Sequence, residues 1–108
     1  MRNKYKLPLH IKNYVRKELN DYKRNKNKLN ELDKNTSTRA ILIASQKIQQ
    51  IENVLNRLSK EDTKMVEKIF FERCNQAHME TYYYVTKDMY YNTMNKIIYL
   101  VAIEFELI

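Results

Sequence analysis

The chain contains no glycine, no tryptophan and a single proline, Pro8, among its 108 residues. Glycine and proline are the residues that most often interrupt helices and build tight β-turns. Their near absence predicts an almost entirely α-helical protein. It also excludes phosphate sites of the P-loop and Rossmann kinds, because no glycine is present to let the backbone approach a phosphate.

Cysteine and histidine are also scarce. Cys74 is the only cysteine, so it has no internal disulfide partner, and together with His10 and His78 it makes a poor set of zinc ligands. No serine stands near a histidine in any recognised catalytic order, and paired acids occur only where helices are expected to begin. We therefore expect no enzyme activity, no metal site and no cofactor.

Long apolar segments are missing as well. The basic amino terminus is not followed by the apolar segment of a signal peptide. No stretch approaches the roughly 20 apolar residues that a membrane-spanning helix requires. We expect a cytoplasmic protein without membrane contact.

Positive charge, in contrast, is abundant and unevenly distributed. The formal net charge is +7; residues 1–34 hold 11 lysines and arginines against four acids, whereas residues 35–108 hold nine of each sign. A local basic field of this kind suits a polyanion such as DNA, or an acidic protein surface. A solvated helix face that only increases solubility is the competing interpretation.

The spacing of apolar residues predicts a helical hairpin in a first region, residues 1–58. Its first helix is expected over residues 9–34 and its second over 38–58, with a polar turn between them. The apolar stripe of the first helix consists of Ile11, Val15, Leu19, Tyr22, Leu29 and Leu32.

The second helix carries a narrow apolar seam at alternating three- and four-residue spacings, which is typical of coiled coils. The seam consists of Ile41, Ala44, Ile48, Ile51, Leu55 and Leu58. Two partners fit this seam. The first helix would complete an antiparallel hairpin within the chain, and a second copy of the protein would form a homodimer through helix 38–58.

The second region, residues 59–108, is predicted to hold three further helices, which makes about five in all. Ser59 is a candidate cap for a helix over 61–73, Asn75 for a helix over 76–84, and Thr86 for a long final helix. The inward face of the final helix is expected to consist of Met89, Thr93, Ile97, Leu100, Val101 and Phe105.

Residues 75–98 therefore read as a short helix, a turn at Val85 and Thr86, and a helix with a polar outer side. This is the arrangement of a helix-turn-helix, whose second helix contacts base edges with its first turns. Tyrosines flank the turn at 82–84 and 90–91. Two or three of their phenols should face outward, where they could contact phosphate, bases or protein, or the rings could instead cover the core.

The chain resembles the small phage-encoded late transcriptional regulators of the ArpU/RinA/LtrC type, whose carboxyl-terminal half is similar to region four of sigma-70-type factors. The resemblance is carried by 14–23 (YVRKELNDYK), 58–62 (LSKED), 65–71 (MVEKIFF), 85–86 (VT), 89–91 (MYY) and 95–104 (NKIIYLVAIE). It implies a phage or mobile-element origin, a bacterial host cell and binding near a promoter. Asn92 stands where relatives often have arginine, Met89 where they often have a small hydroxyl residue, and Glu106 where they commonly have glycine.

These observations favour a regulator that binds double-stranded promoter DNA through the helix-turn-helix. The residues expected to face the groove or its phosphates are Lys87, Tyr90, Tyr91, Asn92, Asn95 and Lys96, with backbone contacts from Arg16, Lys17, Lys23 and Arg24. The alternative is a protein-binding modulator with a regulator-like fold that targets a related activator or an RNA polymerase subunit. A small packaging or assembly protein is a third possibility.

Overall fold

A computed structural model describes residues 5–31 and 38–108, and within these residues it contains helices and no strands. The elements are α1 (Leu9–Asn20), α2 (Tyr22–Asn30), α3 (Thr38–Arg57), α4 (Lys60–Val66), a π-helical turn η1 (Glu67–Phe71), α5 (Gln76–Tyr83) and α6 (Lys87–Glu104). The predicted all-α class is confirmed. The described residues form six α-helices, where about five were expected.

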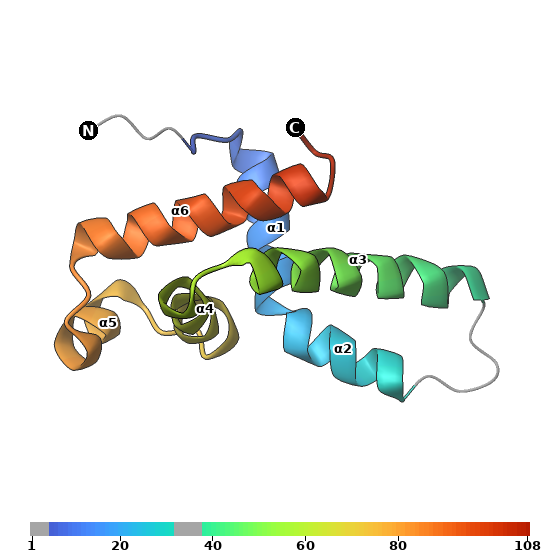
Figure 1. Cartoon of the computed structure of the whole chain (residues 1–108), viewed down its shortest axis with the longest axis horizontal. Coiled ribbons are helices and arrows are strands. Elements are labelled where there is room, and N and C mark those ends of the chain that lie inside the picture. Colours follow the sequence, from blue (N-terminus) through green and yellow to red (C-terminus); the bar gives the residue numbers. More distant parts are fainter. Residues whose placement is uncertain (1–4, 32–37) are drawn as a thin grey trace.

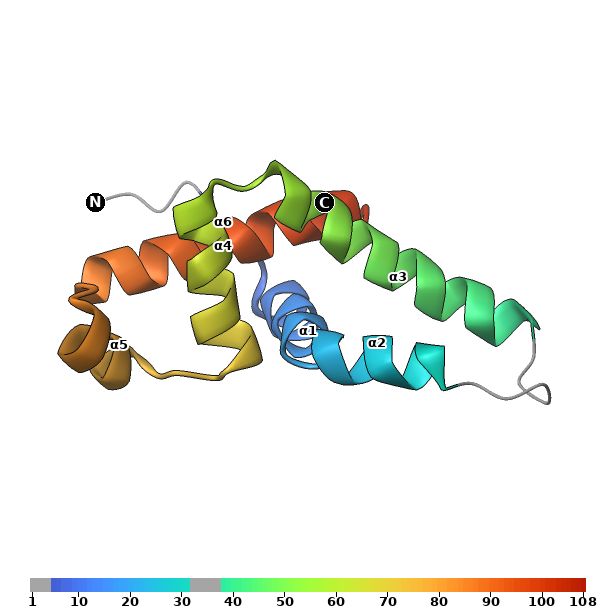
Figure 2. The ribbon, with the colours of Figure 1, turned by 60° about the horizontal axis from the view of Figure 1, so that its bottom comes forward.

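The additional helix arises because the helix predicted over residues 9–34 is interrupted at Asp21. Here the backbone reaches φ −93° and ψ −1°, and α2 leaves α1 at an angle (Figure 2). The change of direction allows the Tyr22 ring to stack on Phe71, with centroids 5.3 Å apart. The expected stripe residue Leu32 lies outside the described residues.

Helices α2 and α3 lie side by side and run in opposite directions (Figures 1 and 2). The predicted intramolecular hairpin is therefore confirmed for α2 and α3, whereas α1, which was expected to extend it, packs against α6 and η1. Within the expected seam, Ile48 and Ile51 are buried, and Leu55 and Leu58 are half-buried against the core. Ile41 and Ala44 remain partly exposed, because the far end of the hairpin projects from the rest of the molecule.

The core is a single cluster of buried side chains to which every helix contributes. Its centre is α6, where Ile97, Ile98 and Val101 are almost completely buried. Helix α1 crosses behind α6 and contributes Val15 and Leu19, while α3 packs against α6 from another side (Figure 1). Burying each such side chain contributes about 1.5–3 kcal/mol relative to leaving it exposed. Residues 1–58 and 59–108 thus share one core, and their division into two domains stays a prediction.

The segment between α3 and α5 begins as the sequence predicts and then departs from regular α-helix. The Ser59 hydroxyl caps α4 by accepting a hydrogen bond from the Asp62 N–H at 3.1 Å. The helix then widens, and the Glu72 N–H donates to the Glu67 carbonyl five residues earlier. A π-turn shifts the rotation of the side chains that follow it. Consecutive Ile69 and Phe70 are both buried as a result.

The buried face of α6 differs from the predicted one at its amino-terminal end. Met89, expected inward, is 53 % exposed, and Thr93 is only half-buried. Tyr90 and Met94, one residue further along in each case, occupy the core instead. The predicted burial of Ile97 and Val101 is confirmed. Over the first two turns of α6, each buried position therefore lies one residue later than predicted. The buried face is rotated around the helix axis by the angle between consecutive residues.

Candidate nucleic-acid interface

Helices α5 and α6 are joined by three residues, and both helices begin with a side-chain cap. The Asn75 Oδ1 accepts a hydrogen bond from the His78 N–H at 2.8 Å, and the Thr86 Oγ1 accepts one from the Met89 N–H at 3.2 Å. Both caps were predicted, and both satisfy N–H groups that would otherwise lack a partner in the first turn. Helix α5 lies below the start of α6 in Figure 1.

The connection between the two helices is made by a left-handed residue followed by a buried one. Tyr84 adopts φ 55°, and the Val85 N–H donates to the Met79 carbonyl at 3.3 Å, which closes the end of α5. The Val85 side chain is 7 % exposed and packs into the core. This anchored turn fixes the first turns of α6 relative to α5.

The outward side of the first half of α6 is polar and nearly neutral. Lys87, Asp88, Tyr91 and Asn92 are exposed, and Asn95 is half-exposed. Residues spaced three and four apart share one side of a helix, so Asp88, Asn92 and Asn95 lie together. This side therefore offers hydrogen-bonding groups for base edges but little positive charge.

Tyr90 does not belong to this outward side, and its predicted orientation toward a DNA groove is wrong. Its ring is 8 % exposed, and its hydroxyl donates to the Cys74 carbonyl at 3.2 Å. Burial raises the pKa of the Tyr90 phenol. Its edge contacts the Tyr91 ring, with the centroids 5.1 Å apart, so that Tyr90 supports an exposed neighbour. Tyr90 is therefore a core residue that contacts the exposed Tyr91.

Lys96 is also partly occupied within the molecule. Its Nζ lies 2.8 Å from the Asp62 carboxylate, which ties α6 to α4. The hydrogen bond to this carboxylate raises the pKa of Lys96. Lys96 keeps its charge, but Asp62 neutralises much of the field that it would present to a partner.

Beside the polar side of α6 lies an open depression of about 360 Å³, here called the basic depression. It is lined by residues of α1, η1, the segment after η1, α5 and α6: Arg16, Asn20, Ile69, Phe70, Arg73, Cys74, Asn75, Gln76, Tyr90, Tyr91 and Met94. Two guanidinium groups thus share one hollow with side-chain amides and a tyrosine. Such donors bind phosphate oxygens, and arginine does so with two parallel hydrogen bonds.

The two arginines of the basic depression differ in how they are held. The Arg16 guanidinium contacts the Met94 sulfur at 3.1 Å, and no described carboxylate lies within ion-pair distance of it. Arg73 lies 3.6 Å from the Asp21 carboxylate, and its side chain is 64 % exposed. A thioether is a weak acceptor. Arg16 consequently retains most of its capacity to bind an anion.

Further basic groups continue from this depression along the start of α2. Arg24 shares Asp21 with Arg73, and the Lys23 ammonium lies 5.3 Å from the centroid of the Phe71 ring. The structure thus gathers Arg16, Lys23 and Arg24, three of the four basic residues predicted for backbone contacts. Lys17, the fourth, is exposed on α1.

Asn95 lies in a second, smaller depression of about 230 Å³ on another side of α1. Its lining includes Lys6 and Lys12 as well as Tyr5, whose ring packs against Tyr99 with centroids 5.4 Å apart. Asn95 is thereby brought close to two lysines that the sequence analysis did not place in the site. The polar side of α6 is flanked by basic residues on two sides.

Arg73 is another residue that the sequence analysis did not place in the site. It follows η1, adopts a left-handed conformation with φ 55°, and enters the site only because α1 packs against η1. No local motif marks such a position. The single usable signal is its place two residues before the Asn75 cap, where the chain must turn into α5.

A second feature of this end of the molecule is a cluster of exposed aromatic rings on α5. His78 packs against Tyr82 at 4.6 Å and Tyr83 at 5.9 Å, and the Lys68 ammonium lies 4.9 Å from the Tyr83 centroid. Tyr84, beside them, is 89 % exposed. Exposed aromatic groups of this size are typical of surfaces that contact other macromolecules.

Residues 5–31 and 38–108 contain no group of three or more histidine, cysteine or acidic side chains that could hold a metal ion. Within the same residues, no helix has the length and apolar character needed to cross a bilayer. Comparison with protein-family models, with curated proteins and with solved structures gives no match.

Proposed function

We propose that the protein is a transcriptional regulator that binds double-stranded DNA through α5 and α6. The observation that supports this most directly is the basic depression, which places Arg16 and Arg73 beside the exposed polar side of α6. In a helix-turn-helix, the second helix enters the major groove and neighbouring groups hold the phosphates. The three-residue connection between the capped helices fits this motif in length.

In this proposal the two kinds of contact come from different parts of the chain. Asn92 and Asn95 supply amides that can pair bidentately with adenine, and Tyr91 adds a hydroxyl and a ring face. Arg16 and Arg73 hold one backbone phosphate, with Lys23 and Arg24 further along the strand. Lys87 is an exposed cation at the first position of α6. Affinity then depends mainly on groups outside the recognition helix.

The resemblance to phage late transcriptional regulators adds the biological setting to this proposal. It implies that the DNA is a promoter region of a phage or mobile element, with RNA polymerase nearby. One structural detail is compatible with it. Glu106, at the position where those regulators commonly have glycine, adopts φ 59°, a conformation that glycine reaches without steric cost.

Selection from a random library of duplexes about 30 base pairs long tests the proposal without knowledge of the natural site. Fluorescence anisotropy with the selected duplex should then show affinity falling steeply between 50 and 200 mM salt, because bound phosphates release counterions. Replacing Arg16 and Arg73 together by alanine should weaken binding by roughly tenfold or more and reduce the salt slope by about two.

The matched control replaces two exposed lysines of α4, Lys60 and Lys64, which line neither depression. This variant loses the same charge and should change affinity less than threefold. Asn92→Ala should reduce discrimination among sequences while leaving the salt slope intact. Absence of any selected duplex at low salt, or equal losses in both double variants, would contradict the proposal.

A second function is favoured by the aromatic cluster of His78, Tyr82, Tyr83 and Tyr84. A protein-binding modulator would use this surface to contact a related activator or an RNA polymerase subunit, and its α6 would need no phosphate contacts. Affinity capture from host lysate treated with nuclease separates the two functions. A partner retained by the wild-type chain and lost in Tyr82→Ala/Tyr84→Ala supports the modulator, whereas retention of nucleic acid alone supports the regulator.

The number of copies in solution bears on both functions. A homodimer through helix 38–58 would use the exposed Leu42 and Ile43, since Ile48 and Ile51 are already packed within the chain. Light scattering coupled to size exclusion distinguishes a monomer from a dimer, and a dimer predicts a two-fold symmetric DNA site. A ring of many copies would instead point to a packaging or assembly protein.

A further inference from the structure

The α2–α3 hairpin carries an open groove that DNA binding does not use. The groove has a volume of about 310 Å³ and is lined by Glu18, Tyr22, Asn25, Lys28, Leu29, Ala44, Lys47, Ile48 and Ile51. Leu29, Ala44 and Ile48 provide an apolar floor between the two helices. Ile43, 51 % exposed, lies one turn before Lys47 on the same side of α3 and extends the apolar surface.

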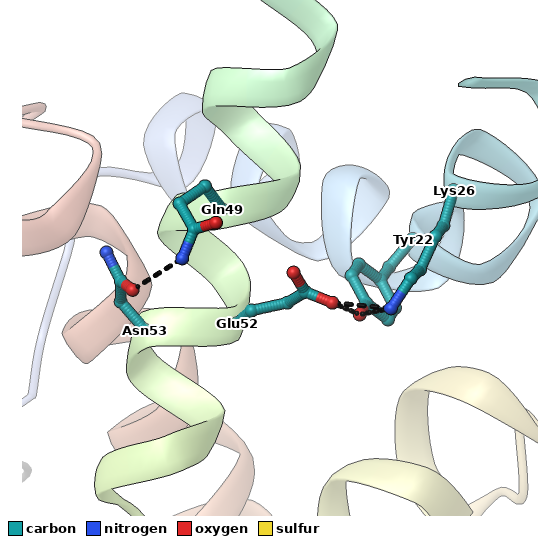
Figure 3. A network of polar contacts seen from close by, with 5 residues as sticks. All are labelled: Tyr22, Lys26, Gln49, Glu52 and Asn53. Atoms are coloured by element: carbon teal, nitrogen blue, oxygen red, sulfur yellow. Dashed lines mark hydrogen bonds and ion pairs between the residues drawn. The ribbon is translucent and has the colours of Figure 1, made fainter. Parts of the chain in front are cut away.

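On the other side of the hairpin, a polar network links α2 to α3. The Tyr22 hydroxyl donates to the Glu52 carboxylate at 2.7 Å, and the Lys26 ammonium contacts the same oxygen at 2.6 Å (Figure 3). Neither Lys26 nor Glu52 lines the groove. Contacts across one side thus hold α2 and α3 together while the opposite side stays open, and a preformed site lowers the entropic cost of binding.

The edges of the groove are basic. Lys28 is exposed on α2, and Lys47 is held on α3 by the Tyr14 hydroxyl and by Glu18 at 3.5 Å. Of the four cations of α2, Lys28 lines the groove, whereas Arg24 pairs with Asp21 and Lys26 pairs with Glu52. An apolar floor between basic edges is complementary to a helix with an apolar stripe and acidic flanks.

We propose that this groove binds an amphipathic, acidic helix of a protein partner. Apolar side chains one turn apart on that helix fill the space above Leu29, Ala44 and Ile48, and its acids pair with Lys28 and Lys47. This docking site is separate from the basic depression and from the aromatic cluster. It would let the protein hold DNA and a protein partner at the same time.

A second copy of the chain is a poorer occupant, for electrostatic reasons. Lys28 and Lys47 line the groove, and Glu18, the acid among its lining residues, already pairs with Lys47. Two hairpins packed groove to groove would therefore bring like charges together. Such juxtaposition costs several kcal/mol at an interface.

Fluorescence anisotropy with a designed peptide tests the proposal. The peptide is a labelled helix of about 20 residues with leucines on one side and glutamates elsewhere, and its comparison peptide has the same composition in scrambled order. The wild-type chain should bind the first peptide at least tenfold more tightly. Ala44→Phe, which fills the groove without removing a core side chain, should weaken binding by tenfold or more, whereas Ala77→Phe on the exposed side of α5 should not.

Charge reversal provides an independent measurement. Lys28→Glu should weaken peptide binding about two- to fivefold, while Lys60→Glu on α4 should leave it unchanged within twofold. Circular dichroism confirms that each variant folds. Equal binding of the two peptides, or unchanged binding by Ala44→Phe, would overturn the proposal. So would a wild-type dimer that becomes a monomer in Ala44→Phe, because the occupant would then be a second copy.

Discussion

The α2–α3 hairpin and the α5–α6 unit are built in different ways. The hairpin is held by contacts between side chains distant in sequence, chiefly the network of Tyr22, Lys26 and Glu52. The α5–α6 unit is held by local caps at Asn75 and Thr86 and by a few deeply buried side chains. Local caps specify where a helix begins, whereas long-range networks specify how two helices lie against each other. Only the second kind of contact depends on the remainder of the fold.

The two regions also divide the surface chemistry between them. The hairpin side carries the excess positive charge, and the α5–α6 unit carries exposed aromatic and amide groups with few cations. The basic depression lies outside the hairpin, between α1, η1, α5 and α6, because α1 brings Arg16 beside α6. In the proposed function, DNA contacts the arginines of this depression together with the amide groups of α6.

The largest expected effect comes from the single buried anchor of α5. Met79 is 1 % exposed and is the only fully buried residue of that helix. Met79→Ala should lower the free energy of unfolding by about 2–4 kcal/mol, through lost burial and the cavity left behind. Chemical denaturation measures this directly. The matched variant Met65→Ala, at a partly buried site on α4, should cost roughly half as much or less.

A smaller, pH-dependent effect on the free energy of unfolding should come from the hairpin network of Tyr22, Lys26 and Glu52. The hydrogen bond from Lys26, followed by that from Tyr22, lowers the pKa of Glu52. A carboxyl whose pKa is lowered by folding adds stability above its unfolded pKa of about 4.3, and this stability is lost as the pH falls through the lower folded value. Glu52→Gln should therefore cost about 0.5–1 kcal/mol at pH 7, because the network is partly exposed.

Urea denaturation at pH 7 and at pH 3 separates this contribution from a general charge effect. The difference between wild type and Glu52→Gln should shrink toward zero at the lower pH. Glu67→Gln, at an exposed glutamate of η1, serves as the matched control. Its free energy of unfolding should differ little from that of the wild type at either pH. A Glu52→Gln penalty that stays constant with pH would show that the carboxylate charge does not stabilise the hairpin.

The difference between local caps and long-range contacts also explains which features could be predicted from sequence. The caps at Ser59, Asn75 and Thr86 were predicted because each depends on one side chain and an N–H a few residues away. The all-α class followed from the absence of glycine and the near absence of proline. These features need no knowledge of tertiary contacts.

The features that were missed depend on contacts between distant segments. The break at Asp21 lies inside the helix predicted over residues 9–34, at a residue whose carboxylate lies 3.6 Å from Arg73 and at the point where Tyr22 turns to stack on Phe71. The burial of Tyr90 in place of Met89 depends on the Cys74 carbonyl, which accepts the phenol hydrogen bond. Arg16 and Arg73 line the same depression because α1 packs against η1. Periodicity alone contains none of this information.

The last expected effect has the opposite sign and concerns the turn of the α5–α6 unit. Tyr84 adopts a left-handed conformation that a side chain with a Cβ reaches only at a steric cost. Tyr84→Gly should therefore raise the free energy of unfolding by about 0.5–1 kcal/mol, whereas Tyr82→Gly within α5 should lower it by about 1 kcal/mol. Thermal and urea denaturation of the two variants measure both changes.

A stabilising Tyr84→Gly would mean that the tyrosine is kept at this position at the expense of the fold. Its ring is 89 % exposed, so the compensating gain would come from a contact outside the molecule. Partner capture by Tyr84→Gly then distinguishes the two proposed functions. Loss of a protein partner with unchanged DNA affinity would assign the aromatic cluster to protein binding, and loss of DNA affinity would place Tyr84 within the nucleic-acid interface.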